Sequence, residues 1–289
     1  MATLKDLPFL MALLDDPAPA VRAAVTRELR GMGVALDAAS AAYREHLSPD
    51  ALETLDEVLD EVRTALRSIP WLAWLELDSS ADSLEAALIT LGAVEYEEAA
   101  WDVPDQLDML AAQYLDTVSG PDAASLMRFL FQHQEFTVHP DGRELPIHDH
   151  LPYVLLHKSG SMLGLSCLSV LLAARVGIPM DIVCIQGNYL PAVLHQGAIQ
   201  LFNPAAGGQA LPRGSMMYIE EAIRRNRMAP HALCASACEI VEAMLEFGSH
   251  YYARKHAAQR AGQYATMQAE LNFATAGHAV SGPGAVQQG

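Results

Sequence analysis

Basic residues are scarce in this sequence of 289 residues. It has 18 lysines and arginines against 35 aspartates and glutamates, which gives a formal net charge of -17 at pH 7. Proteins that bind nucleic acids usually present a basic face, and anionic membranes attract basic segments. The composition therefore argues against a nucleic-acid partner and against a membrane partner.

The excess of acid is concentrated in the first part of the chain. Residues 1–120 hold 23 acidic and 7 basic residues, a net charge of -16, whereas residues 121–289 hold 12 and 11, a net charge of -1. An acidic excess of this kind usually lies on a solvated surface that keeps the protein soluble. A docking face for a basic partner is the alternative.

Long apolar runs are also missing, and so is a secretory signal. Lys5, Asp6 and Pro8 interrupt the apolar start of the chain. The longest apolar stretch, 159–174, contains serines and glycines and ends at Arg175, which favours a buried helix over a membrane span. We therefore expect a cytoplasmic protein.

Cysteines are few, and all lie within apolar patterns: Cys167, Cys184, Cys234 and Cys238. This placement predicts reduced thiols in a core and no disulfide scaffold. Because 51% of the residues are hydrophobic, the chain can bury a sizeable core, in one large domain or two modest ones.

The apolar periodicity before residue 134 is helical. Residues 4–33 resemble one HEAT-type helical hairpin, and the absence of a second copy argues against a solenoid. Further helices are expected over 48–68, 82–92, 104–118 and 122–133. A break is predicted at 70–74, where Trp71 and Trp74 would be packing anchors. Residues 134–149 read as a long, ordered loop.

Residues 150–208 hold the strongest pattern of the chain. A short helix over 151–157 precedes a helix over 162–176, which ends at Gly177-Ile178-Pro179. Short strands are predicted at 181–185, 190–195 and 198–202, the last two antiparallel around Gln196-Gly197.

Helices are expected again at 215–227, 231–247 and 249–273. The uncharged, glycine-rich end of the chain predicts a disordered tail. The chain thus divides into an acidic helical region, a core, C-terminal helices and a tail, at 1–133, 134–212, 213–275 and 276–289. The predicted class is α+β and predominantly helical.

Five short stretches occur in order between residues 148 and 208, namely HDHLPYVL, HKSGSMLGL, RVGIP, IQGNYL and FNPAAGG. In this order they resemble the core of the transglutaminase-like superfamily, a relative of the papain-type cysteine enzymes, and most of all its bacterial Sir-B-type branch. The resemblance implies a core helix packed on a short antiparallel sheet, with helical regions on both sides.

In catalytic members of that superfamily, a Cys opens the core helix, a His begins the next strand and an Asp lies on the strand after it. The thiolate attacks, the His transfers the proton and the Asp orients the His. The corresponding positions here are Met162, Asn188 and Asn203. A thioether cannot be deprotonated, and an amide is no general base near neutral pH. The resemblance therefore implies a degenerate site, without catalytic residues.

Other groups offer weaker alternatives for chemistry. Cys167 follows Met162 by five residues, so it points about 140° away on a helix and reads as a core thiol. Ser161 fits an N-cap better than a nucleophile. Metal ligation by His148 and His150, near Asp149 and His139, or by Cys234 and Cys238, is the lesser interpretation.

We therefore expect a pseudoenzyme that works as a binding or scaffold module for a protein or peptide partner, with no metal and no cofactor. Its cleft would recognise an amide or peptide through five residues, Ser161, Met162, Asn188, Tyr189 and Asn203. The alternative is an enzyme with rewired chemistry, a thiol-, serine- or metal-dependent hydrolase or acyltransferase. A third possibility is that the acidic N-terminal helices are the functional surface.

Overall fold

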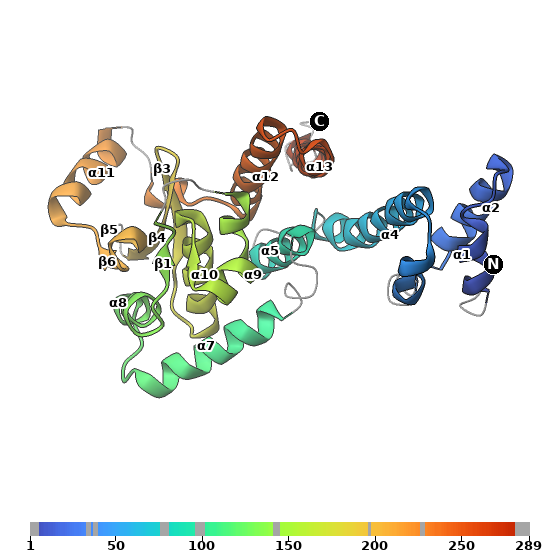
Figure 1. The fold of residues 1–289 in the computed structure, drawn as a ribbon. Helices are drawn as coiled ribbons and strands as arrows, with labels where there is room; N and C mark the ends of the chain where they lie inside the picture. The colour runs from blue at the N-terminus through green and yellow to red at the C-terminus, as the bar shows by residue number, and fades with distance from the viewer. Residues whose placement is uncertain are drawn as a thin grey trace, which may run out of the picture. The chain divides into compact units, whose positions relative to one another are not determined.

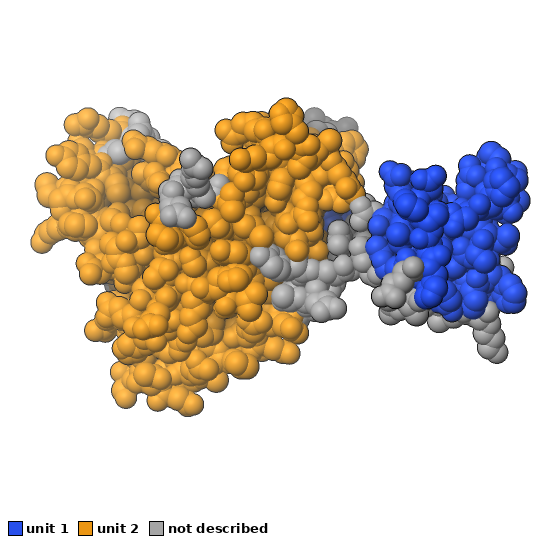
Figure 2. Space-filling view, in the orientation of Figure 1, with its two compact units in different colours: residues 1–73 blue, residues 74–289 orange. Residues whose placement is uncertain are grey.

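Helices make up most of the chain, and a small antiparallel sheet lies near its middle, as predicted (Figure 1). The computed structural model describes residues 6–32, 36, 40–75, 81–95, 102–140, 145–195, 198–225 and 229–280. The chain forms two compact units, residues 1–73 and 74–289 (Figure 2).

The first unit begins with the predicted helical hairpin. Helix α1 (Leu7–Leu13) and helix α2 (Pro19–Arg30) are joined by a short turn, and Pro19 stands at the first position of α2, where its missing N–H is harmless. They are followed by a 3-10 helix η1 (Ala41–His46) and by helix α4 (Pro49–Leu75). The unit has its own apolar core, whose buried members include Leu7, Met11, Val25, Leu29, Leu36, Leu55, Val58 and Leu59.

The break predicted at 70–74 is wrong, because α4 continues to Leu75. Proline inside a helix removes one backbone hydrogen bond and usually ends or kinks the helix. Here Trp71 and Trp74, three residues apart, are both buried, so continuing the helix removes two indole rings from water. The Trp74 Nε1–H also donates to the backbone oxygen of Ser83 at 2.6 Å. The tryptophans are the expected packing anchors.

The second unit starts with three predicted helices, α5 (Ala81–Glu95), α7 (Val103–Thr117) and α8 (Ala123–Arg128). A π-helical turn, η2 (Phe129–His133), extends α8. The expected loop 134–149 contains a two-residue strand, β1 (Thr137–Val138), and a 3-10 helix, η3 (Pro146–Asp149). Helix α9 (Leu151–His157) follows.

The predicted core helix and three strands are confirmed. Helix α10 (Met162–Arg175) follows a short strand β2 (Ser159–Gly160) that pairs in parallel with β1. Strands β3 (Asp181–Ile185), β4 (Asn188–His195), β5 (Ala198–Asn203) and β6 (Gln209–Ala210) form an antiparallel sheet in sequence order. Strand β4 starts two residues earlier than predicted because Asn188 pairs with Ile185. The predicted turn at 196–197 lies outside the described residues.

The remaining chain is helical again, with boundaries that differ from prediction. A 3-10 turn η4 (Pro204–Ala206) leads to β6, after which come α11 (Arg213–Arg225), a 3-10 helix η5 (Pro230–Leu233), α12 (Ala237–Arg254) and α13 (Ala258–Val280). Helix α13 continues past residue 276, where the tail was expected to start, and residues 281–289 lie outside the described part.

The prediction that Cys234 and Cys238 share a helix is wrong. Cys234 forms a β-bridge with Val183, and α12 begins only at Ala237. The reason is a capping box, in which Ser236 and Glu239 satisfy each other's backbone N–H groups and so fix the helix start.

Within the described ranges, no helix is both long enough and apolar enough to cross a membrane.

Candidate functional site

The first turn of α10 is fixed by two hydrogen bonds of Ser161. Its Oγ accepts a hydrogen bond from the backbone N–H of Gly164 at 2.9 Å, which is the expected N-cap, and donates to Oδ1 of Asp149. Ser161 is 2% exposed and Asp149 is 6% exposed. The Ser161 hydroxyl therefore caps α10 from a buried position.

Gly164 allows η3 to pass directly over this turn. A Cβ at position 164 would lie 2.7 Å from the backbone oxygen of His148 and 3.1 Å from that of Asp149. The same backbone oxygen of His148 accepts from the N–H of Ser161 at 2.9 Å. The approach of η3 to α10 therefore depends on a residue without a side chain.

Met162 lies beside an apolar cluster of the sheet and α11, here called the sheet cluster. The cluster consists of Val183, Leu190, Ala192, Ile199, Leu201 and Met216. Met162 is half-buried and packs against this cluster. Met162 thus contributes packing at the first turn of α10, and its thioether offers no proton to transfer.

Asn188 and Asn203 lie at one end of the sheet, because β4 starts where the antiparallel β5 ends. The Oγ of Ser166 links this end to α10, because it lies 2.7 Å from the backbone oxygen of Met162 and 2.9 Å from that of Tyr189, and its one hydrogen is shared between these two acceptors. The structure thus brings the first turn of α10 and the start of β4 together.

Both asparagines use their side chains locally. The Nδ2 of Asn188 donates to the backbone oxygen of Ile185 at 3.3 Å, across the turn between β3 and β4. The Oδ1 of Asn203 accepts from the N–H of Ala205 at 3.0 Å and caps η4. Asn188 is exposed and Asn203 is half-buried, so each keeps one amide atom for a ligand.

Tyr189 lies beside a recess of about 360 Å³ that the sequence did not indicate. Burial, and to a smaller extent the neighbouring Cys184, raise the pKa of Tyr189 to about 12, so the phenol stays protonated. Three carboxylates from one face of α12 line the other wall, at Glu239, Glu242 and Glu246. The spacing of these glutamates, three and four residues apart, was the sequence signal that could have placed them on one face of a helix.

Three of the four thiols, Cys167, Cys234 and Cys238, lack the lowered pKa of a nucleophile. Cys167 is fully buried, and burial raises its pKa far above the ordinary value for a thiol. Burial also raises the pKa of Cys234 and of Cys238. A reactive cysteine requires a lowered pKa, so these three sites favour the inert thiol.

His148 in η3 and His150, the residue between η3 and α9, lie in two different environments. His148 stacks on His139 with ring centroids 4.1 Å apart, and burial together with His139 lowers its pKa. His150 is buried on the other side, where its Nε2 lies 3.1 Å from the hydroxyl of Tyr264. In the described part of the chain, no three His, Cys, Asp or Glu side chains gather as metal ligands would.

A buried carboxylate, Glu95 at the end of α5, joins several helices. It accepts hydrogen bonds from the hydroxyls of Tyr252 at 2.8 Å and Tyr264 at 3.3 Å, and it pairs with Arg260. Since Tyr264 donates to Glu95, its oxygen accepts the Nε2 hydrogen of His150. Burial lowers the pKa of His150 to about 4. This network fastens α12 and α13 to the core.

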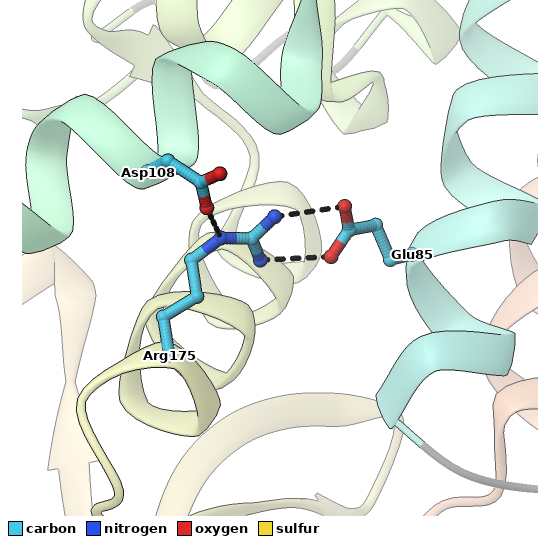
Figure 3. A network of polar contacts seen from close by, with 3 residues as sticks. All are labelled: Glu85, Asp108 and Arg175. Carbon is cyan, nitrogen blue, oxygen red and sulfur yellow. Dashed lines mark hydrogen bonds and ion pairs between the residues drawn. The ribbon is translucent and has the colours of Figure 1, made fainter.

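The far end of α10 is fixed by an arginine (Figure 3). Arg175 binds Glu85 of α5 with two hydrogen bonds, at 2.8 and 2.9 Å, and its Nε donates to Asp108 of α7 at 2.6 Å. The side chains of Arg175 and Glu85 are each only 18% exposed. Hydrogen bonding to Glu85 raises the pKa of Arg175, so the clamp stays charged.

Taken together, the polar groups near α10 hold elements in place, with Ser161 at its first turn and Arg175 at its last. The model of the Transglutaminase-like superfamily matches residues 101–245, which run from the start of α7 into α12. The comparisons with curated proteins and with solved structures returned no match. The helix-on-sheet core and this match establish that the chain belongs to the transglutaminase-like superfamily.

Proposed function

We propose that this protein is a non-catalytic member of the superfamily, which works as a binding or scaffold module for a protein or peptide. The order of its core motifs supports a place in the bacterial Sir-B-type branch. The observation that carries the proposal is the first turn of α10, where Met162 packs against the sheet cluster in place of a nucleophile.

Further support comes from the groups that could replace the lost chemistry. The hydroxyl of Ser161 is committed to Gly164 and Asp149. Burial holds Cys167 in its thiol form. A nucleophile needs access to its substrate together with an adjacent base or a lowered pKa. The carboxylate of Asp149 does lie beside Ser161, but both side chains are buried, and the pKa of Cys167 is raised. The environments of Ser161 and Cys167 therefore favour a binding function over the alternative of a rewired hydrolase or acyltransferase.

The binding surface in this proposal is the end of the sheet near α10, with Met162, Asn188, Tyr189 and Asn203. The free amide atoms of the two asparagines can pair with the backbone of an extended peptide, because amides both donate and accept. The apolar side of Met162 can contact a side chain of that peptide.

Two measurements test the proposal. The full chain is titrated with amide and peptide libraries while the side-chain amide signals of Asn188 and Asn203 are followed by NMR, and these signals are expected to shift. In parallel, the chain is incubated with activated acyl donors and its intact mass is measured by mass spectrometry, and no acyl adduct is expected. Met162→Cys is the matched comparison, since it places a thiol at the helix start.

An acyl adduct or turnover by the unaltered chain would overturn the non-catalytic assignment. Unchanged signals of Asn188 and Asn203 across the libraries would remove the proposed binding surface.

A further inference from the structure

Helix α11 lies over the sheet cluster, against which Met162 also packs. Its residues Met216, Ile219 and Ile223 recur at helical spacing, so they share one face. Met216 is a member of the cluster, and Ile219 and Ile223 pack against it, as Met162 does. Helix α11 therefore covers apolar residues of β3, β4 and β5 beside Met162.

This helix is held less firmly than its neighbours. Its ion pairs, between Glu221 and Arg224 and between Glu221 and Arg225, are internal. Among the described residues, no hydrogen bond or ion pair joins α11 to another element. By contrast, α10 is bound to α5 through Arg175, and α13 to α5 through Arg260.

Most of the surface of α11 faces water. Met216 is 8% exposed, whereas the next two residues, Met217 and Tyr218, are 62% and 82% exposed. Figure 1 shows α11 in orange at the outer edge of its unit, beyond β5 and β6. One row of apolar side chains thus attaches α11 to the rest of the unit. Elements with few buried contacts detach from a folded protein more readily than firmly packed ones.

The chain before α11 provides a fixed point for such an opening. Strand β6 pairs with β5, and the N–H of Leu211 donates to the backbone oxygen of Leu201 at 2.8 Å. Pro212 follows directly and has no N–H to bond. The pairing with the sheet therefore ends at Leu211, before α11 begins.

From these contacts we infer that α11 is a displaceable lid and that the sheet cluster beneath it is a docking site for an amphipathic helix of a partner protein. The occupant is deduced from α11 itself, which already fills the site with apolar residues at positions i, i+3 and i+7. The inference rests on the proposed function, since it names the partner's binding element and the segment that controls access.

The tether explains how weak contacts keep the site closed. A segment joined by a short linker acts at an effective concentration on the order of millimolar. A partner helix must therefore bind the cluster more tightly than α11 does, or arrive in excess. The lid in this way excludes apolar segments that bind the sheet cluster only weakly.

Lid opening is measured by single-residue thiol labelling in the full chain. Met216→Cys places a thiol under the lid, and Met217→Cys places one on the exposed face of the same helix. Met244→Cys is the control for a residue in the firmly held α12, where Met244 is 2% exposed. Because Cys184, Cys234 and Cys238 are partly exposed, labelling is assigned to each residue by peptide mass spectrometry.

The lid predicts an order of labelling rates. Met217→Cys reacts at once, Met216→Cys reacts at least about 10-fold faster than Met244→Cys, and Met244→Cys reacts only through larger opening. Equal rates at 216 and 244 would show that α11 is a fixed wall and would overturn the inference. That outcome would leave the non-catalytic function intact, because it changes neither acyl transfer nor the signals of Asn188 and Asn203.

Docking is measured with a peptide of residues 211–225 added to the full chain. In an Ile219→Ser, Ile223→Ser double variant the tethered lid is weakened, so this chain is expected to bind the peptide at least about 10-fold more tightly than the unaltered chain. A Met217→Ser, Tyr218→Ser variant changes only the exposed face and is expected to behave as the unaltered chain does. Equal peptide affinity in all three chains would overturn the docking site.

Discussion

At the scale of single residues, the core requires that Gly164 has no side chain. The backbone oxygens of His148 and Asp149 lie where its Cβ would be. Both oxygens belong to backbone, so they cannot rotate away as a flexible side chain could. The contact can be relieved only by moving η3 away from α10.

Gly164→Ala is therefore expected to lower the free energy of unfolding by about 1 to 3 kcal/mol, the usual range for overpacking. Urea denaturation followed by circular dichroism measures the change. Gly262→Ala is the matched control, because nothing lies within 4 Å of a Cβ at that position in α13. There, alanine is expected to raise stability by about 0.5 to 1 kcal/mol. Equal effects at both positions would contradict the packing argument.

His150 predicts a dependence of stability on pH. Burial lowers its pKa to about 4 in the folded chain, whereas an unfolded histidine titrates near 6.5. Between these values the unfolded chain binds a proton that the folded chain does not, so stability falls as the pH drops through this window. His148, whose pKa is also lowered, acts in the same direction.

Replacing His150 by Gln removes this titration. Between about pH 6.5 and pH 4.5 the loss of unfolding free energy is expected to be smaller in His150→Gln by about 1 to 3 kcal/mol. Urea denaturation at each pH measures it, and His231→Gln, at an exposed histidine, serves as the control. A pH profile that is parallel to that of the unaltered chain would show that His150 does not titrate in this window.

Residues near one another in sequence were predictable, and distant partners were not. The N-cap role of Ser161 followed from its place before an apolar helix. The partners of Glu95 stand 157 and 169 residues away in the sequence, at Tyr252 and Tyr264. No periodicity links such positions, because only the packing of α12 and α13 brings them together.

At the scale of elements, Arg175 links α10 to both α5 and α7. Arg175→Ala leaves Glu85, a largely buried carboxylate, without its bidentate partner and is expected to destabilise the chain by about 1 to 3 kcal/mol. Arg175→Lys is expected to restore only part of this, because lysine cannot form the two-pronged contact. Thermal unfolding compares both with Arg224→Ala, where an exposed pair is removed and little change is expected.

The element boundaries show where sequence patterns end and tertiary packing decides. Gly177 and Pro179 marked the end of α10 within one residue. Pro70 suggested a break that the buried tryptophans of α4 override. The two-residue strands β1, β2 and β6 carry too few residues to show an alternation, so they could not be predicted.

At the scale of the whole molecule, the two units have separate cores. The first unit buries Leu29 and Leu55 within its own apolar cluster. All four cysteines belong to the second unit. Labelling of the fully buried Cys167 therefore reports the opening of the second unit alone.

Leu29→Ala is expected to destabilise the first unit by about 2 to 5 kcal/mol, through lost burial and a cavity. Circular dichroism should then show an earlier helical transition, while the labelling rate of Cys167 stays the same. Leu168→Ala, at an equally buried site in α10, is the counterpart and should speed the labelling of Cys167. Faster labelling of Cys167 in Leu29→Ala would show that the units unfold together.

The clamps at the two ends of α10 have a mechanical consequence. Ser161 ties its first turn to η3, and Arg175 ties its last turn to α5 and α7. A helix that is bound to other elements at both ends has little freedom to shift or tilt. Helix α10 is thus fixed to its neighbours at both ends, and we expect it to move less than α11, whose described ion pairs are all internal.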